Sequence, residues 1–175
     1  LKELNEHTKT NALNDLLAPL RAGLDIGLLS EAGCPAVADP GANLVALAQQ
    51  ENIRVVPLIG PSSLLLALMA SGLNGQRFAF QGYLPAKEAE RTTALRNLES
   101  ESRKWSQTQI FIETPYRNRA MFDAILNACQ PGTRLTVATD LTQPREMVRT
   151  QTIMNWKKQT PPDIERRPTV FLLLA

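Results

Sequence analysis

The chain has 175 residues, of which 43% are hydrophobic and 21% charged, and its net charge is +2. This composition is typical of folded globular proteins and argues against a disordered, collagen-like or solenoid protein. The longest apolar runs, residues 64–70 and 170–175, are far shorter than the roughly 20 residues of a membrane-spanning helix. We therefore expect no association with a membrane.

Cysteine and histidine are scarce. Cys34 and Cys129 are far apart and form no CxxC pair, and His7 is the only histidine. These residues argue against a disulfide scaffold, a zinc site and a Ser-His-Asp triad, and we expect no metal. A reducing, cytoplasmic location is the default expectation.

In the first part of the chain, apolar spacing predicts helices that alternate with buried strands. The expected elements are a helix over 11–22, a strand over 24–29, a helix that Asp39 caps and Pro40 begins, a strand over 53–58, and a helix over 64–71 that Gly72 ends. The alternation continues with a strand over 78–83, a charged helix over 87–102, a strand over 109–113, a helix over 114–129, strands over 135–139 and 145–151, a short helix over 152–159, and a strand over 168–174. This order predicts an α/β protein with a mainly parallel sheet.

The charge is unevenly distributed along the chain. Residues 1–84 hold five basic against seven acidic residues, a net of −2, and residues 85–175 hold fourteen against ten, a net of +4. The change coincides with a Leu-Pro-Ala turn at residues 84–86, so we expect one domain over 1–84 and a second over 85–175. The mildly basic second half is compatible with a phosphate-bearing partner.

Three loops after expected strands have compositions suited to a ligand. The loop over 30–41 is rich in small residues, the loop over 60–63 places two serines at a helix start, and the segment over 113–117 is polar. Ordinary turn and capping chemistry is the alternative for all three. Neither GxGxxG nor GxxxxGK[ST] is present, which argues against dinucleotide and P-loop binding. The Arg166–Arg167 pair is interpreted as a charged turn, with a phosphate contact as the alternative.

The same loops carry a resemblance to a known family. The sequence Ser-Glu-Ala-Gly-Cys-Pro-Ala-Val-Ala-Asp-Pro-Gly at 30–41 resembles the S-D-A-G-x-P-x-x-x-D-P-G motif of the tetrapyrrole methylase superfamily. Further matches occur in the family's order over residues 4–7, 53–62, 70–73, 77–78 with 82–87, and 111–117. The branch it most resembles is ribosomal RNA small subunit methyltransferase I.

This resemblance implies an S-adenosylmethionine-dependent methyltransferase that acts on the 2′-oxygen of a cytidine in ribosomal RNA. It also implies two α/β/α domains with the cofactor in the cleft between them, and a homodimer that binds no DNA. Family members begin with a strand and a glycine-proline loop, which precede the part matched here. We therefore expect the N-terminal domain to be incomplete.

Carried over residue by residue, the resemblance implies a set of cofactor contacts. They are Ala32, Gly33, Cys34, Val37, Ser62, Ser63, Phe111, Ile112, Glu113, Ala138, Thr139, Pro168 and Thr169. A ribose hydroxyl also needs a proton acceptor. Glu31 and Glu113 are the candidate catalytic residues, and a structural ion pair or helix cap is the alternative for each.

One segment departs from the ribosomal RNA branch, which usually has A-R-E-L-T-K at this point. Residues 138–143 read Ala-Thr-Asp-Leu-Thr-Gln, so Thr139 replaces an arginine and Gln143 a lysine. Two alternatives therefore stay open, namely methylation of a tetrapyrrole-like small molecule and a non-catalytic, cofactor-binding paralogue.

Overall fold

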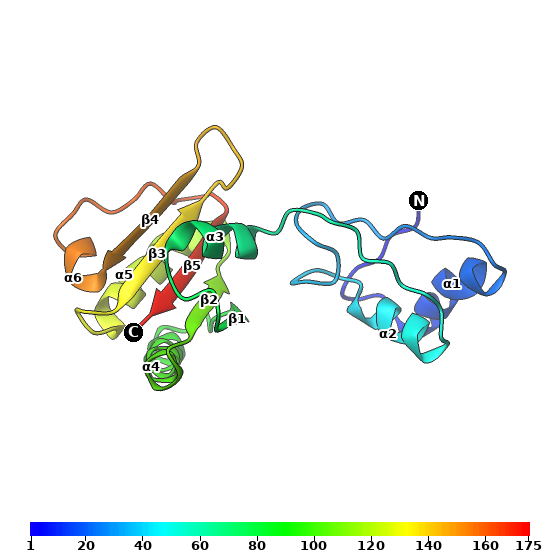
Figure 1. The fold of residues 1–175 in the computed structure, drawn as a ribbon, viewed down its shortest axis with the longest axis horizontal. Helices are drawn as coiled ribbons and strands as arrows, with labels where there is room; N and C mark the ends of the chain where they lie inside the picture. The colour runs from blue at the N-terminus through cyan, green and yellow to red at the C-terminus, as the bar shows by residue number, and fades with distance from the viewer. The chain divides into compact units, whose positions relative to one another are not determined.

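A computed structural model describes residues 1–175, except for the side chain of Thr10. The chain divides into two compact units, Leu1–Ser62 and Ser63–Ala175, which are described separately below as the first and second unit (Figure 1). A domain joint at residues 84–86 stays a prediction.

The first unit is built on two helices, α1 (Thr10–Arg21) and α2 (Ala42–Gln50). The expected helix over 11–22 is confirmed by α1, and Leu13 and Leu17 of its apolar face are buried together with Ala48 of α2. At the surface, the guanidinium of Arg21 donates to Glu51. This hydrogen bond lowers the pKa of Glu51 and raises that of Arg21.

The prediction of strands over 24–29 and 53–58 is wrong. Neither segment pairs with a neighbour within Leu1–Ser62, and most of their apolar side chains are exposed, with Leu24 at 62% and Leu58 at 88%. A strand exists only where its N–H and C=O groups meet a partner. An apolar sequence was therefore not sufficient for a strand, because these segments have no pairing partner within the unit.

The helix cap expected at Asp39 is also wrong. The residue that precedes α2 is Gly41, with φ of 132°, and no side chain caps the helix. A Cβ atom at Gly41 would lie 2.8 Å from Cδ2 of Leu28. Glycine therefore fits both the backbone conformation and the close approach at this position.

The second unit contains every strand of the described chain. Its elements are α3 (Ser63–Ser71), β1 (Phe78–Tyr83), α4 (Glu88–Trp105), β2 (Thr108–Ile112), the 3-10 turn η1 (Pro115–Arg117), α5 (Asn118–Ala128), β3 (Arg134–Thr139), β4 (Met147–Thr152), α6 (Ile153–Trp156) and β5 (Thr169–Leu174). Each strand and helix expected after residue 63 is present, and the ends of these elements differ from the expected ends by at most four residues. Two of the expected helices are shorter than predicted. The helix expected over 114–129 begins as η1 before α5, and that expected over 152–159 is the single turn α6.

Within the second unit the strands form one sheet in the order β1-β2-β5-β3-β4. β1 and β2 are parallel, whereas β5 pairs antiparallel with both β2 and β3, and β4 pairs antiparallel with β3. The expectation of a mainly parallel sheet is therefore wrong, although the α/β class is confirmed. Residues 140–146, which join β3 to β4, are too few for the crossover of a dozen or more residues that a parallel pair needs.

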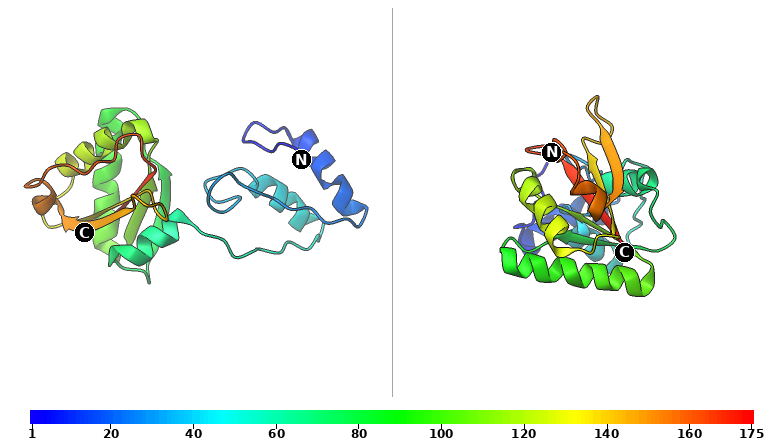
Figure 2. Two further views of the ribbon diagram at one scale, coloured as in Figure 1. Left: turned by 90° about the horizontal axis from the view of Figure 1, so that it is seen from above. Right: turned by 90° about the vertical axis from the view of Figure 1, so that its left-hand side faces the viewer.

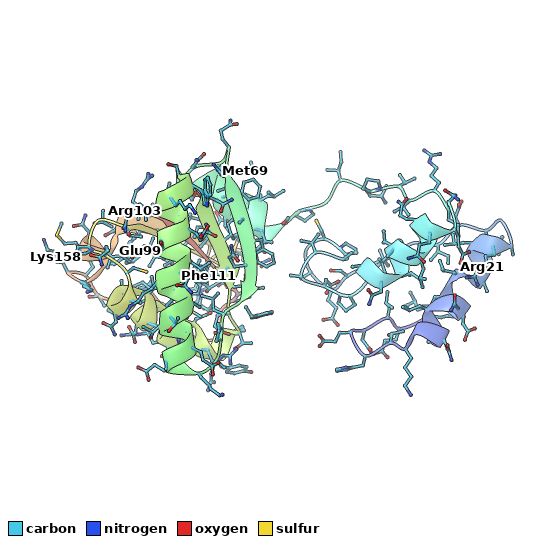
Figure 3. The ribbon with its side chains drawn as sticks, turned by 90° about the horizontal axis from the view of Figure 1, so that it is seen from below. Arg21, Met69, Glu99, Arg103, Phe111 and Lys158 are labelled. Carbon is cyan, nitrogen blue, oxygen red and sulfur yellow. The ribbon has the colours of Figure 1, made fainter. Side chains whose placement is uncertain are left out.

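Helices cover both faces of this sheet (Figure 2). Alternate residues of β5 point to opposite faces: Val170 and Leu172 pack against α3, and Phe171 and Leu173 pack in the core that α4, α5 and α6 cover. On α4, the buried carboxylate of Glu99 accepts hydrogen bonds from the Gln130 backbone N–H, at 2.7 Å, and from the Thr133 hydroxyl. Figure 3 labels Glu99 on α4 and Phe111 in the sheet behind it.

The two cysteines are expected to differ in reactivity. Burial, and secondarily the charge of Glu99, raises the pKa of the Cys129 thiol to about 12, whereas Cys34 is half-buried. Because the thiolate is the nucleophile, iodoacetamide at pH 8 should modify Cys34 and leave Cys129 intact until the chain is unfolded, as read by peptide mass spectrometry. Modification of Cys129 in the folded protein at the same rate as in urea would contradict this.

Candidate functional site

The loop over residues 30–41 has a tightly turned backbone. The hydroxyl of Ser30 donates to the Ala32 carbonyl at 2.7 Å and accepts from the Ala32 N–H at 3.2 Å. Gly33, Ala36 and Ala38 all have positive φ, of 76°, 65° and 55°. Gly33 adopts this conformation without strain, and the small side chains of the loop leave its backbone open to a ligand.

This loop lies beside the loop that ends the first unit. The Cys34 thiol is 3.4 Å from the Pro61 carbonyl oxygen, which directly precedes Ser62. The fold thus brings together the expected contacts Cys34 and Ser62, which are 28 positions apart in the sequence. Val37 is half exposed and Glu31 is exposed, so both remain accessible to a ligand.

In the second unit, strand ends converge at one edge of the sheet. Because β5 runs antiparallel to β2 and β3, its first residues lie beside the last residues of both: Ile112 pairs with Val170, and Thr139 with Thr169. The hydroxyls of Thr139 and Thr169 are 3.2 Å apart. The register therefore places the expected contacts from three separate strands at the same edge.

The side chains of these contacts do not all face the same way. Ala138 lies in the core under α3, and Phe111 lies in the opposite core, where its ring stacks on Phe171 with centroids 5.8 Å apart. Both side chains are almost completely buried. Phe111 can therefore offer only its backbone to a ligand. Ser63 and Pro168, by contrast, are exposed.

Glu113 follows β2 and is tied to its own turn. Its side chain is fully buried, and Oε1 accepts from the Thr114 N–H at 2.7 Å and from the Arg117 guanidinium at 2.6 and 3.0 Å. Its other oxygen, Oε2, has no hydrogen-bond partner among the described residues. This carboxylate thus has a structural ion pair, and its second oxygen is buried without a hydrogen-bond partner in the described part of the chain.

Hydrogen bonds of Arg167 fix the segment that precedes β5. They were not predicted from the sequence. Arg167 is only 14% exposed; its Nε donates to Asp140, directly after β3, at 2.8 Å, and its Nη2 donates to the Arg145 carbonyl at 2.7 Å. Arg167 is therefore not the solvated turn residue that was expected. Buried Asn118 adds hydrogen bonds to the carbonyls of Ile164, at 3.0 Å, and Arg167, at 2.7 Å. The loop before Thr169 is thus fixed to both neighbouring strand ends.

Other parts of the described chain offer less for chemistry. A hollow of about 570 Å³ borders α5 and α6 and is lined by residues that include Leu126 and Trp156, at the end of α5 remote from Glu113. Among the described residues, no group of three or more His, Cys, Asp and Glu side chains is placed to hold a metal ion. Nor is any described helix long and apolar enough to cross a bilayer.

Comparison with known proteins gives consistent matches. The family model of the tetrapyrrole (corrin/porphyrin) methylases matches residues 2–155. Ribosomal RNA small subunit methyltransferase I of Escherichia coli O157:H7 is 34% identical over 175 residues, which cover 98% of this chain and 59% of that protein. The protein of the same name from Xylella fastidiosa is 33% identical over 175 residues, which cover 100% of this chain and 63% of that protein. The chain thus spans less than two thirds of the length of these relatives.

Solved structures share the fold at low sequence identity. The methyltransferase CobJ matches with a TM-score of 0.62 and 18% identity, over 96% of this chain and 72% of that one. Uroporphyrin-III C-methyl transferase from Thermus thermophilus, solved with S-adenosylhomocysteine, matches with a TM-score of 0.51 and 17% identity, over 94% of this chain and 72% of that one. At these identities the likeness concerns the fold alone.

Proposed function

We propose a function from the finding that this chain belongs to the tetrapyrrole (corrin/porphyrin) methylase family. The proposed function is S-adenosylmethionine-dependent methylation of small-subunit ribosomal RNA. The observation that carries the proposal is the meeting of Ile112, Thr139 and Thr169 at one sheet edge, since α/β proteins bind ligands where strand ends and loops converge. The proposal that RNA is the methyl acceptor comes from the names of the relatives, which are ribosomal RNA small subunit methyltransferases. The finer assignments that we propose are the 2′-oxygen of a cytidine, a homodimer, a cytoplasmic location, and domains over 1–84 and 85–175.

The residues present fit a neutral-to-cationic nucleoside cofactor. Gly33 has open space where a Cβ would be, so the backbone of the 30–41 loop is accessible. In the second unit, Thr139 and Thr169 are buried and their hydroxyls lie 3.2 Å apart, so these side chains fix the strand ends, and the proposed polar contacts to the nucleoside are backbone groups at those ends. S-adenosylmethionine supplies a methyl group on a sulfonium; the chain's task is to hold donor and acceptor in line, which accounts for much of the acceleration in such reactions.

Two carboxylates are proposed as acceptors for the proton of the ribose hydroxyl. Glu31 is exposed on the 30–41 loop and free to meet a substrate. Glu113 is buried and shares Oε1 with Arg117, which leaves Oε2 alone for that role. The exposed carboxylate fits better, because a general base must lie within hydrogen-bond reach of its proton.

Transfer of a tritiated methyl group from S-adenosylmethionine tests the function. Small-subunit particles from cells that lack the methylation serve as acceptor in one reaction and uroporphyrinogen in a second, and digestion of the RNA to nucleosides locates the label in the first. We expect label in a 2′-O-methylated cytidine. Label in uroporphyrinogen instead would favour the small-molecule alternative, and cofactor binding without transfer to either acceptor would favour the non-catalytic paralogue, to which the replacements at Thr139 and Gln143 point.

A further inference from the structure

Two exposed side chains stand together just beyond the sheet edge described above. The Tyr116 ring in η1 is 81% exposed. The guanidinium carbon of Arg166 lies 6.0 Å from the centroid of that ring. Tyr116 comes four residues after the end of β2, and Arg166 comes three residues before the start of β5. The pair therefore belongs to the segments that follow β2 and precede β5.

Arg166 differs from the arginines around it. Arg117, Arg145 and Arg167 each form an ion pair with a carboxylate, whereas Arg166 has none among the described residues. Its φ is 57°, a left-handed conformation that is uncommon for a side chain of this size. Its N–H donates to the Pro115 carbonyl at 3.1 Å, which fixes it against the Tyr116 turn. The Arg166 guanidinium is thus exposed to solvent and has no carboxylate partner among the described residues.

Hydrogen bonds anchor the backbone on both sides of Arg166. The side-chain amide of buried Asn118 donates to the carbonyls of Ile164 and Arg167, on either side of Arg166. Arg167 in turn is bonded to Asp140. The backbone of Arg166 is therefore tied to α5 and to the Tyr116 turn, and a backbone fixed in this way loses less entropy on binding.

We infer that Tyr116 and Arg166 form a stacking platform for an unpaired base of the RNA substrate, with Arg166 also meeting an adjacent phosphate. The inference rests on the proposed function and names residues that contact its acceptor. Unstacked RNA bases are held on aromatic rings and arginine planes. The exposed ring supplies the stacking face, and the unpaired cation supplies the charge that a phosphate seeks.

The chain contains a matched control at the other end of the sheet. Trp105 is 42% exposed, with the Arg77 guanidinium carbon 4.8 Å from its ring centroid. It ends α4, before β2 begins, and Arg77 directly precedes β1. Because β1 and β2 are parallel, this second aromatic–arginine pair lies at their amino ends. It offers similar chemistry away from the proposed site.

Fluorescence anisotropy with a short, fluorescein-labelled single-stranded RNA tests the inference. Tyr116→Ala should weaken binding by about fivefold or more, Tyr116→Phe should bind as the unaltered chain does, and Trp105→Ala should have little effect. Arg166→Ala should lower the slope of log affinity against log salt by about one. Equal affinity of Tyr116→Ala and the unaltered chain, an equal loss in Trp105→Ala, or no RNA binding by the unaltered chain would overturn the inference.

Calorimetry with S-adenosylhomocysteine separates this inference from the proposed function. Tyr116→Ala should bind that nucleoside as the unaltered chain does. Loss of nucleoside binding in the variant alone would identify the ring as a cofactor contact and overturn the platform, while the methyltransferase proposal stands. Absence of nucleoside binding by the unaltered chain would overturn the proposed function, while the RNA measurements still decide the role of the platform.

Discussion

Replacing Gly33 with valine is expected to weaken the binding of S-adenosylhomocysteine by about a hundredfold. Gly33 has φ of 76° and open space around the position of a Cβ. A β-branched side chain there is strained in the left-handed conformation, and it occupies space through which we propose that the ligand approaches the backbone. Gly33→Ala should give a smaller loss, because its added volume is smaller.

Gly23 provides the control for backbone strain. It has φ of 80°, follows α1, and likewise has nothing within 4 Å of a Cβ, but it lies outside the 30–41 loop. Gly23→Val and Gly33→Val should each lower the free energy of unfolding by a similar amount, about 1–2 kcal/mol. Calorimetric titration should show a binding loss for Gly33→Val alone. Equal nucleoside affinity in the two valine variants would exclude the loop from the cofactor site.

Replacing Trp156 with alanine is expected to lower the free energy of unfolding of the second unit by about 3–5 kcal/mol. Trp156 is 1% exposed and meets Phe122 edge-on, with ring centroids 5.4 Å apart. Its indole N–H donates to the Leu135 carbonyl at 2.9 Å. Truncation leaves a cavity in the core and removes the side chain that anchors the single turn α6 to β3.

Urea unfolding followed by far-ultraviolet circular dichroism measures this loss. Trp105→Ala is the matched control, because Trp105 is partly exposed at the end of α4; we expect it to cost less than about 1 kcal/mol. If the two alanine variants unfold at the same urea concentration, the core packing described for Trp156 is incorrect.

Helices and sheet strands were not equally predictable from the sequence. A helix forms its hydrogen bonds within one segment, so local spacing such as that of Leu13 and Leu17 was sufficient to locate α1. A strand depends on a distant partner. Residues 53–58 have a strand-like composition yet pair with nothing in their unit, whereas β5, which was also expected to be a strand, lies between two strands. The antiparallel insertion of β5 is likewise a property of the whole chain.

The candidate site was predictable in its backbone and less so in its side chains. The small-residue loop that holds Gly33 and the end of β3 at Thr139 follow from chain order and family resemblance. The burial of Arg167 by Asp140, the bonds from Asn118 and the exposure of Tyr116 depend on contacts across more than 20 positions or on the final surface. No local pattern distinguishes Arg167 from its neighbour Arg166, although only one of them is paired.

Amide hydrogen exchange, measured by mass spectrometry with and without S-adenosylhomocysteine, tests the central claim most directly. That claim is that the turns at strand ends and the small-residue loops of this chain hold the nucleoside. We expect slower exchange in peptides that cover residues 32–37, 112–114 and 138–140 and unchanged exchange around Arg77 and Trp105. Protection confined to the hollow beside α5 and α6, or no protection at saturating nucleoside, would contradict the account.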